Sequence, residues 1–231
     1  MQENSYHNGL STTAADILRT GIEAAGGPVA LACSFSMEDL AIIDIAFAAG
    51  ISLGVFAIDT GRLHEETLEV AEALTERYRL KIDWYFPRHE AVEKLARDKG
   101  LFSFRESLDN RFECCRIRKV EPLSRALAGL AGWVTGIRRE QGTTRNELQP
   151  IERDELNGGI LKINPLLDWS EEQLLAYVEE RRLPRNRLYS QGFHSIGCAP
   201  CTRAVVEGED GRAGRWWWEQ ADNKECGLHR R

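Results

Sequence analysis

The chain has 231 residues and a mass of 26.1 kDa, enough for one large domain or two small ones with a sizeable core. Its composition, 42% hydrophobic and 29% charged, is typical of a soluble globular protein and excludes a fibrous or disordered chain. Lys and Arg number 30 against 36 Asp and Glu, a net charge of -6. Proteins that bind nucleic acid nonspecifically usually carry the opposite balance, so we expect no nucleic-acid partner.

No segment predicts membrane insertion or export. The longest apolar stretch, 40–49, is short and contains Asp44, so we expect no membrane-spanning helix. Residues 1–15 are polar and lack the cationic and apolar regions of a signal peptide. We therefore expect a cytoplasmic protein, in which clustered cysteines serve metal or redox chemistry more often than structural disulfides.

Predicted strands and helices alternate along most of the chain, because short apolar runs are followed by helical patterns with start signals. In chain order we expect a strand at 28–34, a helix that begins at the Ser36–Asp39 start signal and runs to 49, a strand at 51–58, a helix to about Tyr78, a strand at 82–86, a helix at about 90–99, strands at 133–137 and 160–163, and a helix from a capping box at Ser170 to before Pro184. This alternation predicts an α/β fold with a doubly wound, mostly parallel sheet. Ligands bind such sheets beyond the carboxyl ends of the strands, here at Ser34, Asp59 and Gly136.

Four of the six cysteines form two pairs, Cys114-Cys115 and Cys198-x-x-Cys201. A spacing of two residues lets both thiolates reach one metal centre. Successive side chains diverge, so an adjacent pair suits a cluster with separate iron atoms better than a single zinc ion, and we favour [4Fe-4S] over zinc. The alternative is four buried, reduced thiols, which the strongly basic segment 111–119 disfavours.

The two other cysteines differ in their surroundings. Cys226 lies near the end of the sequence, where Lys224 and His229 favour a thiolate that could act as a mobile nucleophile. The alternative is an incidental exposed cysteine. Cys33 lies in an apolar strand and is interpreted as a structural residue.

Basic residues gather in three groups despite the acidic balance. Any single group could be a solvated surface, but three groups beside cysteine motifs or strand ends predict a pocket for a small anion. Guanidinium groups match phosphate and sulfate oxygens, and the helix start at 34–39 would add backbone N–H groups. The tryptophans at 216–218 are expected to anchor the tail in the core. The three groups are Arg111–Lys119, Arg138 and Arg139 with Arg145, and Arg203 with Arg212 and Arg215.

Together these motifs resemble the sulfonucleotide reductases, in particular the iron–sulfur type of assimilatory adenosine 5′-phosphosulfate reductase. The matching segments follow the family order from about Val29 to His229 and so cover nearly the whole chain. They are Ser-Phe-Ser-Met-Glu-Asp (34–39), Ile-Asp-Thr-Gly-Arg (58–62), Cys-Cys-Arg-Ile-Arg-Lys (114–119), Gly-Ile-Arg-Arg (136–139), Cys-Ala-Pro-Cys (198–201), Arg-Ala-Gly-Arg-Trp (212–216) and Glu-Cys-Gly-Leu-His (225–229).

The resemblance implies an adenine nucleotide α-hydrolase-like fold with a loop-rich C-terminal tail. Residues 1–205 would form the nucleotide- and cluster-binding α/β domain, and residues 206–231 the tail that carries the catalytic Cys226. It also implies one [4Fe-4S] cluster, whose ligands would be Cys114, Cys115, Cys198 and Cys201.

The implied activity is thioredoxin-dependent reduction of adenosine 5′-phosphosulfate to sulfite and AMP, a step of sulfate assimilation toward cysteine. Cys226 would attack the sulfur of the bound phosphosulfate, AMP would leave, and an S-sulfocysteine would remain. Reduced thioredoxin would then release sulfite through a transient mixed disulfide. Sulfur in a phosphosulfate is electrophilic but shielded by negative oxygens, so attack needs a thiolate and nearby cations.

The resemblance also implies roles for particular substrate-binding residues. Lys119, Arg212 and Arg215 would hold the sulfate end, the Ser34 loop the α-phosphate, and the turn at 59–62 the nucleoside. The full expected set is Ser34, Phe35, Ser36, Asp59, Thr60, Gly61, Arg62, Lys119, Arg138, Arg212, Arg215 and His229.

Three alternatives differ from this interpretation in ways that can be tested. The chain could reduce the 3′-phosphorylated nucleotide, or both nucleotides. An ATP pyrophosphatase-type ligase or thiolase would share the fold, but its Ser-Gly-Gly-x-Asp-Ser loop does not match residues 34–39. A four-cysteine zinc module that binds a partner would leave Cys226 and the arginines unexplained. The sequence leaves open whether the chain forms a homo-oligomer.

Overall fold

The computed structural model describes residues 2–142 and 145–219, with the backbone alone for residues 2–8. The chain divides into two compact units. Unit 1 comprises the residues up to Ala57, Val70–Asp83 and Leu127–Arg185. Unit 2 comprises Ile58–Glu69, Trp84–Ala126 and the residues from Asn186 onward. Within the described residues, no helix is both long and apolar enough to cross a membrane.

Six strands form one sheet, which lies mainly in unit 1, in the order β3-β2-β1-β4-β6-β5. The β1–β2, β1–β4 and β4–β6 pairs are parallel, and β5 is antiparallel to β6. Leu31 in β1 lies opposite Val55 and Val134, and all three side chains are buried, as expected for the centre of a covered parallel sheet. The strands are β1 (Val29–Cys33), β2 (Gly54–Ile58), β3 (Ile82–Tyr85), β4 (Gly132–Val134), β5 (Ile151–Asp154) and β6 (Ile160–Ile163).

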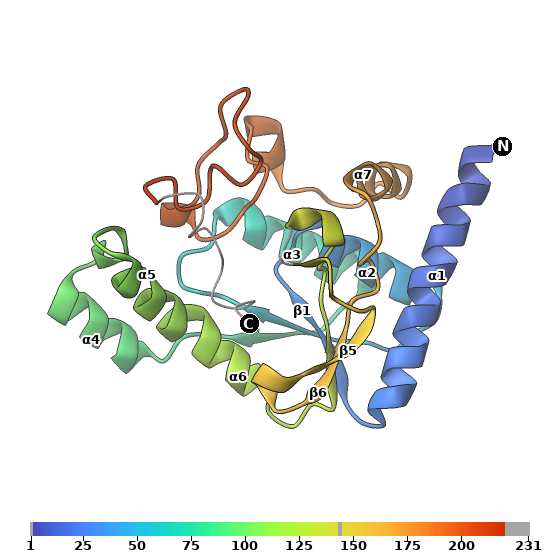
Figure 1. Cartoon of the computed structure of the whole chain (residues 1–231), viewed down its shortest axis with the longest axis horizontal. Helices are drawn as coiled ribbons and strands as arrows, with labels where there is room; N and C mark the ends of the chain where they lie inside the picture. Colours follow the sequence, from blue (N-terminus) through green and yellow to red (C-terminus); the bar gives the residue numbers. More distant parts are fainter. Residues whose placement is uncertain (1, 143–144, 220–231) are drawn as a thin grey trace. The chain divides into compact units, whose positions relative to one another are not determined.

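Helix α1 packs against the sheet of unit 1, and two further helices pack with it in turn. Helix α1 contacts β4, β6 and α2, and α2 contacts α7 (Figure 1). Helix α2 is apolar nearly all round and ten of its residues are buried, so it forms part of the core. These helices are α1 (Gln2–Ala25), α2 (Met37–Ala48) and α7 (Glu171–Glu180), while α3 (Glu65–Tyr78) contributes its later residues to this unit.

A buried carboxylate joins three of the helices. Asp44 in α2 is 2% exposed and accepts hydrogen bonds from the hydroxyls of Tyr78 in α3 and Tyr177 in α7, both at 2.7 Å. The Arg181 guanidinium adds an ion pair at 2.8 Å. Burial alone would raise the pKa of Asp44, but the hydrogen bonds from Arg181, Tyr177 and Tyr78 outweigh it and hold that pKa below its ordinary value. The charge is therefore fully satisfied inside the core.

The cysteine-bearing helices belong to unit 2. Helix α5 (Leu108–Cys115) ends at the adjacent cysteines, continues as a π-helical turn (Arg116–Val120) and then becomes α6 (Glu121–Leu127). Helix α4 (His89–Lys99) precedes them and ends at Gly100, whose φ is +86°. From Asn186 onward the described chain consists of turns and short 3₁₀ helices.

The α/β class and the mostly parallel, doubly wound sheet are confirmed, and each expected strand and helix lies within a few residues of its predicted place. The capping box at Ser170 and Gln173 is also confirmed. We expected a strand over residues 51–58, but β2 begins at Gly54, so residues 51–53 lie outside it. Four elements were missed, namely α1, α5, α6 and β5.

Asp44 yields a test of how the helices are held together. Replacing Asp44 with Ala leaves two buried tyrosine hydroxyls and Arg181 without their acceptor, so we expect the free energy of unfolding to fall by about 3 to 5 kcal/mol. Urea unfolding measures this loss. Asp16→Ala, which removes an exposed ion pair with Arg19, is the matched control and should change stability by less than about 1 kcal/mol. Equal losses in the two variants would contradict the role of Asp44.

Candidate functional site

The loop after β1 in unit 1 is held closed by its own aspartate. Asp39 is 2% exposed, and its Oδ2 accepts hydrogen bonds from the Ser34 amide at 2.7 Å, the Ser34 hydroxyl at 2.8 Å and the Ser36 amide at 3.4 Å. Phe35 between them is buried and has a φ of +64°, a left-handed conformation that costs energy for a residue with a side chain. Ser34 itself is exposed at the carboxyl end of β1. The loop is thus a constrained turn at the start of α2.

The Asp39 carboxyl is poised between its two protonation states. Burial raises its pKa to about 6, the Ser34 and Ser36 hydrogen bonds oppose that rise, and the neighbouring Glu38 charge adds to it. Burial, and after it the negative charge of Asp39, raises the pKa of the Cys33 thiol well above its ordinary value. Burial in β1 thus favours the protonated, less reactive form of the Cys33 thiol, and its structural role stays a prediction.

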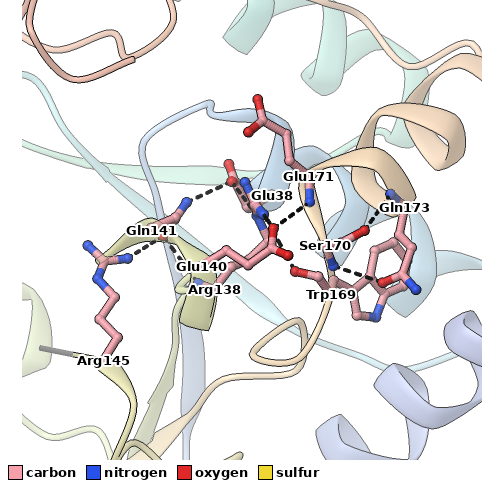
Figure 2. A network of polar contacts seen from close by, with 9 residues as sticks. All are labelled: Glu38, Arg138, Glu140, Gln141, Arg145, Trp169, Ser170, Glu171 and Gln173. Carbon is pink, nitrogen blue, oxygen red and sulfur yellow. Dashed lines mark hydrogen bonds and ion pairs between the residues drawn. The ribbon is translucent and has the colours of Figure 1, made fainter. Parts of the chain in front are cut away.

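The loop after β4 is tied to the same helix start. Arg138, 5% exposed, donates from Nε to Glu38 Oε1 at 3.0 Å, and Gln141 Nε2 donates to the same oxygen at 2.8 Å (Figure 2). Gly136 has no room for a side chain, since a Cβ would lie 2.7 Å from Glu38 Cβ and 2.8 Å from Asp39 Oδ1. The order of the strands changes direction between β1 and β4, and both loops follow these strands. This is the edge at which open α/β sheets bind ligands.

Figure 2 also shows that acidic groups surround Arg138. Its Nη1 lies 3.4 Å from Glu140 Oε2, an oxygen that also accepts a hydrogen bond from the Glu171 amide at the start of α7. Arg145 donates to the Gln141 side chain. Arg138, expected to bind substrate, is thus placed as a link between two loops, with its charge balanced by carboxylates.

The turn after β2 belongs to unit 2 and contacts a cysteine. The Asp59 carboxylate accepts from the Gly61 amide at 2.7 Å, and the Thr60 hydroxyl accepts from the Arg62 amide at 3.2 Å. A hydrogen bond of 3.3 Å joins Thr60 Oγ1 and Cys198 Sγ. The Arg62 carbonyl accepts from the Ala199 amide at 2.8 Å. The turn expected to contact the nucleoside therefore also holds the Cys-x-x-Cys loop.

The four paired cysteines, here called the cysteine cluster, are all buried in unit 2. Cys114, Cys198 and Cys201 pack with Leu95, Phe104 and Trp216 in one apolar group. Burial, and after it the proximity of Cys198, raises the pKa of Cys201 to about 12, with smaller contributions from Cys115 and Cys114. The cysteine cluster consists of Cys114, Cys115, Cys198 and Cys201. These four residues are therefore close enough for one thiol to influence the pKa of another.

The donor chemistry of the cysteine cluster fits a thiophilic metal group. Burial raises the pKa of Cys114, while the Arg62 and Arg118 guanidiniums oppose that rise. Within the described part of the chain, however, no three Cys, His, Asp or Glu side chains are arranged as ligands of one metal ion. Buried thiols with adjacent cations suit an anionic cluster better than the purely apolar role that free cysteines usually have.

Arg118 reaches the cysteine cluster from the π-helical turn. Its side chain is buried, Nη1 donates to the Thr60 carbonyl at 2.6 Å, and its Nε has no hydrogen-bond partner among the described residues. π-helical turns are rare and often mark functional sites, because the extra residue re-aims neighbouring side chains. Here the turn immediately follows Cys115. Lys119 lies near enough to Cys201 to lower its pKa, against the larger effect of burial.

The segment 195–216 wraps around the Cys-x-x-Cys loop. The Trp216 amide donates to the Cys201 carbonyl at 3.1 Å, and the Arg203 amide donates to the Gly214 carbonyl at 3.0 Å. Arg215, 7% exposed, lies over the Trp216 ring and donates to Ser195 Oγ at 3.2 Å. Its Nε has no partner within the residues that the structure describes. Arg215 therefore borders the cysteine cluster with donor capacity to spare.

A buried ion pair holds the last described residue. Arg111 in α5 is fully buried, its Nε lies 2.6 Å from Glu219 Oε1, and its guanidinium stacks between the Phe112 and Trp216 rings. The prediction that the basic segment 111–119 disfavours buried thiols was wrong, because Arg111, Cys114 and Cys115 are all buried. The reason is that Glu219 neutralises Arg111. Trp216 is a core anchor as expected, whereas Trp217 is 37% exposed.

Not all expected residues can be located in this way. Cys226 and His229 lie outside the described residues. Arg212 is half-buried in the same segment as Arg215. Residues of the expected set therefore divide between the units. Ser34, Phe35, Ser36 and Arg138 are in unit 1, and Asp59, Thr60, Gly61, Arg62, Lys119, Arg212 and Arg215 are in unit 2 with the cysteine cluster.

Sequence reasoning missed three residues of these sites. Glu38 was read only as part of a helix start, although a carboxylate that begins an otherwise apolar helix signals a specific partner. His64 is half-buried with an unpartnered Nε2 among the described residues, and burial is the main reason that its pKa is lowered. Arg118 was counted within a basic run but not singled out. Its place three residues after Cys115 on a helix was the available signal.

Comparison with known proteins was made against family models, curated sequences and solved structures. The model of the phosphoadenosine phosphosulfate reductase domain matches residues 28–204, which include β1, the π-helical turn and all four members of the cysteine cluster. The chain belongs to the phosphoadenosine phosphosulfate reductase domain family.

The chain matches two bacterial relatives over most of their length and a plant relative over about half of its length. The chain is 49% identical to an adenosine 5′-phosphosulfate reductase of Burkholderia cepacia, over 87% of this chain and 80% of the relative. A protein of the same name from Allochromatium vinosum is also 49% identical, over 88% and 79%. The chloroplastic 5′-adenylylsulfate reductase 3 of Arabidopsis thaliana is 43% identical over 93% of this chain but only 48% of its own length.

Solved structures support the same fold. A phosphoadenylyl-sulfate reductase from Candida auris, in a phosphate complex, superposes with a TM-score of 0.70 at 26% identity, over 87% of this chain and 97% of that one. A Candida glabrata FMN adenylyltransferase superposes with a TM-score of 0.60 at 17% identity, over 96% and 75%, and shows only the shared architecture. The adenine nucleotide α-hydrolase-like fold expected for this reductase family is confirmed.

Asp39 yields a pH test of the loop in this reductase-family chain. Because its folded pKa of about 6 exceeds the ordinary value of 3.8, protonated Asp39 stabilises the fold at low pH, and that contribution is lost as pH rises through about 6. Between pH 5 and pH 7 the wild-type chain should lose about 1 kcal/mol relative to Asp39→Asn. Urea unfolding at several pH values measures this difference. Asp16→Asn, an exposed control, should show no such slope, and a flat difference for Asp39→Asn would contradict the expectation.

Proposed function

We propose that this chain reduces adenosine 5′-phosphosulfate to sulfite and AMP in sulfate assimilation. The observation that carries the proposal is 49% identity, over 87% of the chain, to a protein named adenosine 5′-phosphosulfate reductase. The cysteine cluster with its adjacent cations, and the constrained loop at 34–39, supply the chemistry that such a substrate needs. An enzyme that acts on a phosphosulfate has to bind a nucleotide phosphate, neutralise sulfate oxygens and present a sulfur nucleophile.

The phosphate-binding part of the proposal rests on unit 1. Ser34 is exposed at the carboxyl end of β1, and the amides of residues 34–37 precede α2, whose N-terminus favours an anion. Asp39 and Glu38 already bind the loop and Arg138, so their charges are largely engaged. We propose that Ser34 and the backbone around it, including that of Phe35 and Ser36, contact the α-phosphate.

The sulfate-binding part rests on unit 2. Arg215 is buried next to Trp216 with an unpartnered Nε among the described residues, and Lys119 influences Cys201. Guanidinium and ammonium groups near a reacting phosphosulfate would lower the repulsion that an approaching thiolate meets. We propose that Lys119, Arg212 and Arg215 hold the sulfate end of the substrate, with His229 as a further contact.

The cofactor proposed for unit 2 is a [4Fe-4S] cluster. Cys114, Cys115, Cys198 and Cys201 would hold it, because four buried thiols gather there beside two cations. When bound, the group would supply an electrostatic and positioning contribution at the sulfate end. The two electrons of the reaction do not need to come from it, since a dithiol can supply them by disulfide exchange.

The nucleophile proposed for the reaction is Cys226. Its thiolate would form an S–S bond to the sulfur of the substrate while the bond from that sulfur to the phosphate oxygen breaks and AMP leaves with the bonding pair. Thioredoxin, the proposed reductant, would attack the Cys226 sulfur with one thiolate and release sulfite. Its second thiol would then resolve the mixed disulfide, so thioredoxin leaves oxidised. A cytoplasmic location and a tail formed by residues 206–231 are further parts of the proposal.

The nucleophile can be tested by intact mass spectrometry. Anaerobic protein mixed with adenosine 5′-phosphosulfate and no reductant should gain one sulfonate group, because the intermediate then accumulates. Cys226→Ser should bind AMP and keep its metal but form no adduct. The buried Cys33 is the matched control, so Cys33→Ala should form the adduct as the wild type does. An adduct on Cys226→Ser would place the nucleophile elsewhere.

The nucleotide preference can be tested by comparing turnover. The family model and the Candida auris structure are named for the 3′-phosphorylated nucleotide, whereas the curated relatives at 49% identity are named for the nucleotide without that phosphate. We expect kcat/KM to be at least about tenfold higher for adenosine 5′-phosphosulfate, a difference of about 1.4 kcal/mol. Steady-state sulfite release with both nucleotides and one thioredoxin measures this ratio. A ratio near or below one would contradict this expectation and would favour reduction of the 3′-phosphorylated nucleotide or of both nucleotides.

A further inference from the structure

The side chain of Arg62 points to chemistry other than nucleoside binding. Its Nη2 donates to the Leu101 carbonyl at 2.7 Å, and its Cζ lies 4.9 Å from the centre of the Phe104 ring. The remaining terminal nitrogen, Nη1, is buried and has no hydrogen-bond partner among the described residues. A buried donor without an acceptor costs energy, so the position calls for a group that is bound in the working protein.

The space beside this donor is small and borders a cysteine. A cavity of about 10 Å³ is lined by Arg62, Phe104, Cys114 and Arg118, among other residues of unit 2. That volume suits an atom or a water molecule and is far too small for an adenosine group. An acceptor that satisfies Nη1 from this side would therefore be a single atom near the Cys114 sulfur.

Charge leads to the same conclusion. The side chains of Arg62 and Arg118 line the same small cavity as Cys114. Neither guanidinium forms an ion pair with a carboxylate in the described parts of the chain. Arg118 is buried and Arg62 is partly buried, so the two neighbouring cations need a negative partner, and the Cys114 side chain borders the same cavity.

Arg62 also touches the second cysteine segment through its backbone. Its carbonyl accepts a hydrogen bond, at 2.8 Å, from the amide of Ala199, which lies between Cys198 and Cys201 in the sequence. The residue thus connects the Cys-x-x-Cys loop, by its main chain, with the surroundings of Cys114, by its side chain.

We propose that Arg62 is a positioning residue for the iron–sulfur cluster, in which Nη1 donates to a sulfur atom and the guanidinium balances the negative charge of the cluster and its thiolates. The inference rests on the proposed [4Fe-4S] cofactor and changes the role of Arg62, which the sequence resemblance assigned to the substrate. Outer contacts of this kind orient ligands and tune the stability of a metal group.

The test measures retention of iron and nucleotide binding separately. Wild type, Arg62→Gln and Arg62→Lys are purified anaerobically with their metal, and iron loss to a ferrous chelator is followed by the visible absorbance. AMP binding is measured by calorimetry on the same preparations. The matched control is Arg105→Gln, because Arg105 also lies over the Phe104 ring, at 5.6 Å, and also donates to a backbone carbonyl, that of Pro200.

We expect Arg62→Gln to lose iron about tenfold faster than wild type, while its affinity for AMP stays within about twofold. Arg105→Gln should lose iron at the wild-type rate. Iron loss at the wild-type rate from Arg62→Gln would overturn the inference, and a weakened AMP affinity with normal iron retention would return Arg62 to the nucleoside. Equal acceleration in Arg62→Gln and Arg105→Gln would mean general loosening and would also overturn it.

The lysine variant keeps the test decisive if Arg62→Gln does not fold. Lysine retains the charge but lacks the planar set of donors, so faster iron loss from Arg62→Lys than from wild type supports the proposed hydrogen bond, and an unchanged rate overturns it. A wild-type chain that purifies with stoichiometric zinc and no iron would overturn the cofactor assignment itself. A different outcome, in which the wild type carries the cluster but replacing Arg62 leaves the rate of iron loss unchanged, would overturn only the role of Arg62.

Discussion

The burial of positive charge beside sulfur is the constraint on which unit 2 depends. Arg118 is buried, Arg62 is partly buried with one terminal nitrogen fully enclosed, and neither has a carboxylate partner in the described chain. Removing a cation from water is costly unless a negative group replaces the solvent. The thiols of the cysteine cluster would supply that group only in their ionised form, which binding of the proposed iron–sulfur cluster would stabilise. Under that proposal, the same event would balance the charge of the two guanidiniums and bind the metal group.

Unit 1 has the opposite arrangement, in which two carboxylates lie beside the loop that we propose to bind a phosphate. Glu38 and Asp39 would repel a phosphate if their charges were exposed. Each is buried, and each accepts several hydrogen bonds, from Arg138 and Gln141 in one case and from Ser34 and Ser36 in the other. Asp39 thus holds the loop through the amide and hydroxyl of Ser34 and the amide of Ser36, while Ser34 as a residue stays exposed. Carboxylates whose charges are engaged in this way would oppose the proposed phosphate less than free ones.

The sequence was sufficient for five of the six strands of the sheet and for the grouping of the cysteines, but not for β5 or for the local geometry around the cysteines. Apolar runs such as 29–33 and the start signal at Ser36 have local physical causes and are read correctly. The π-helical turn after Cys115 depends on tertiary contacts of Arg118, which no local pattern encodes. Arg111 was taken for a surface residue because its partner, Glu219, is more than one hundred positions away. The roles of Cys226 and His229 stay predictions, since these residues lie outside the described chain.

Gly61 has a consequence for how this segment can vary. Its φ of +68° favours glycine, and a Cβ there would lie 3.3 Å from the Arg118 guanidinium. Arg118 in turn donates to the carbonyl of Thr60, the residue immediately before. A side chain at position 61 would consequently meet two costs, the left-handed backbone and the crowding of Arg118, and a smaller residue at position 118 would relieve only the second. Glycine is therefore the residue that this turn requires even beside a shorter side chain at position 118.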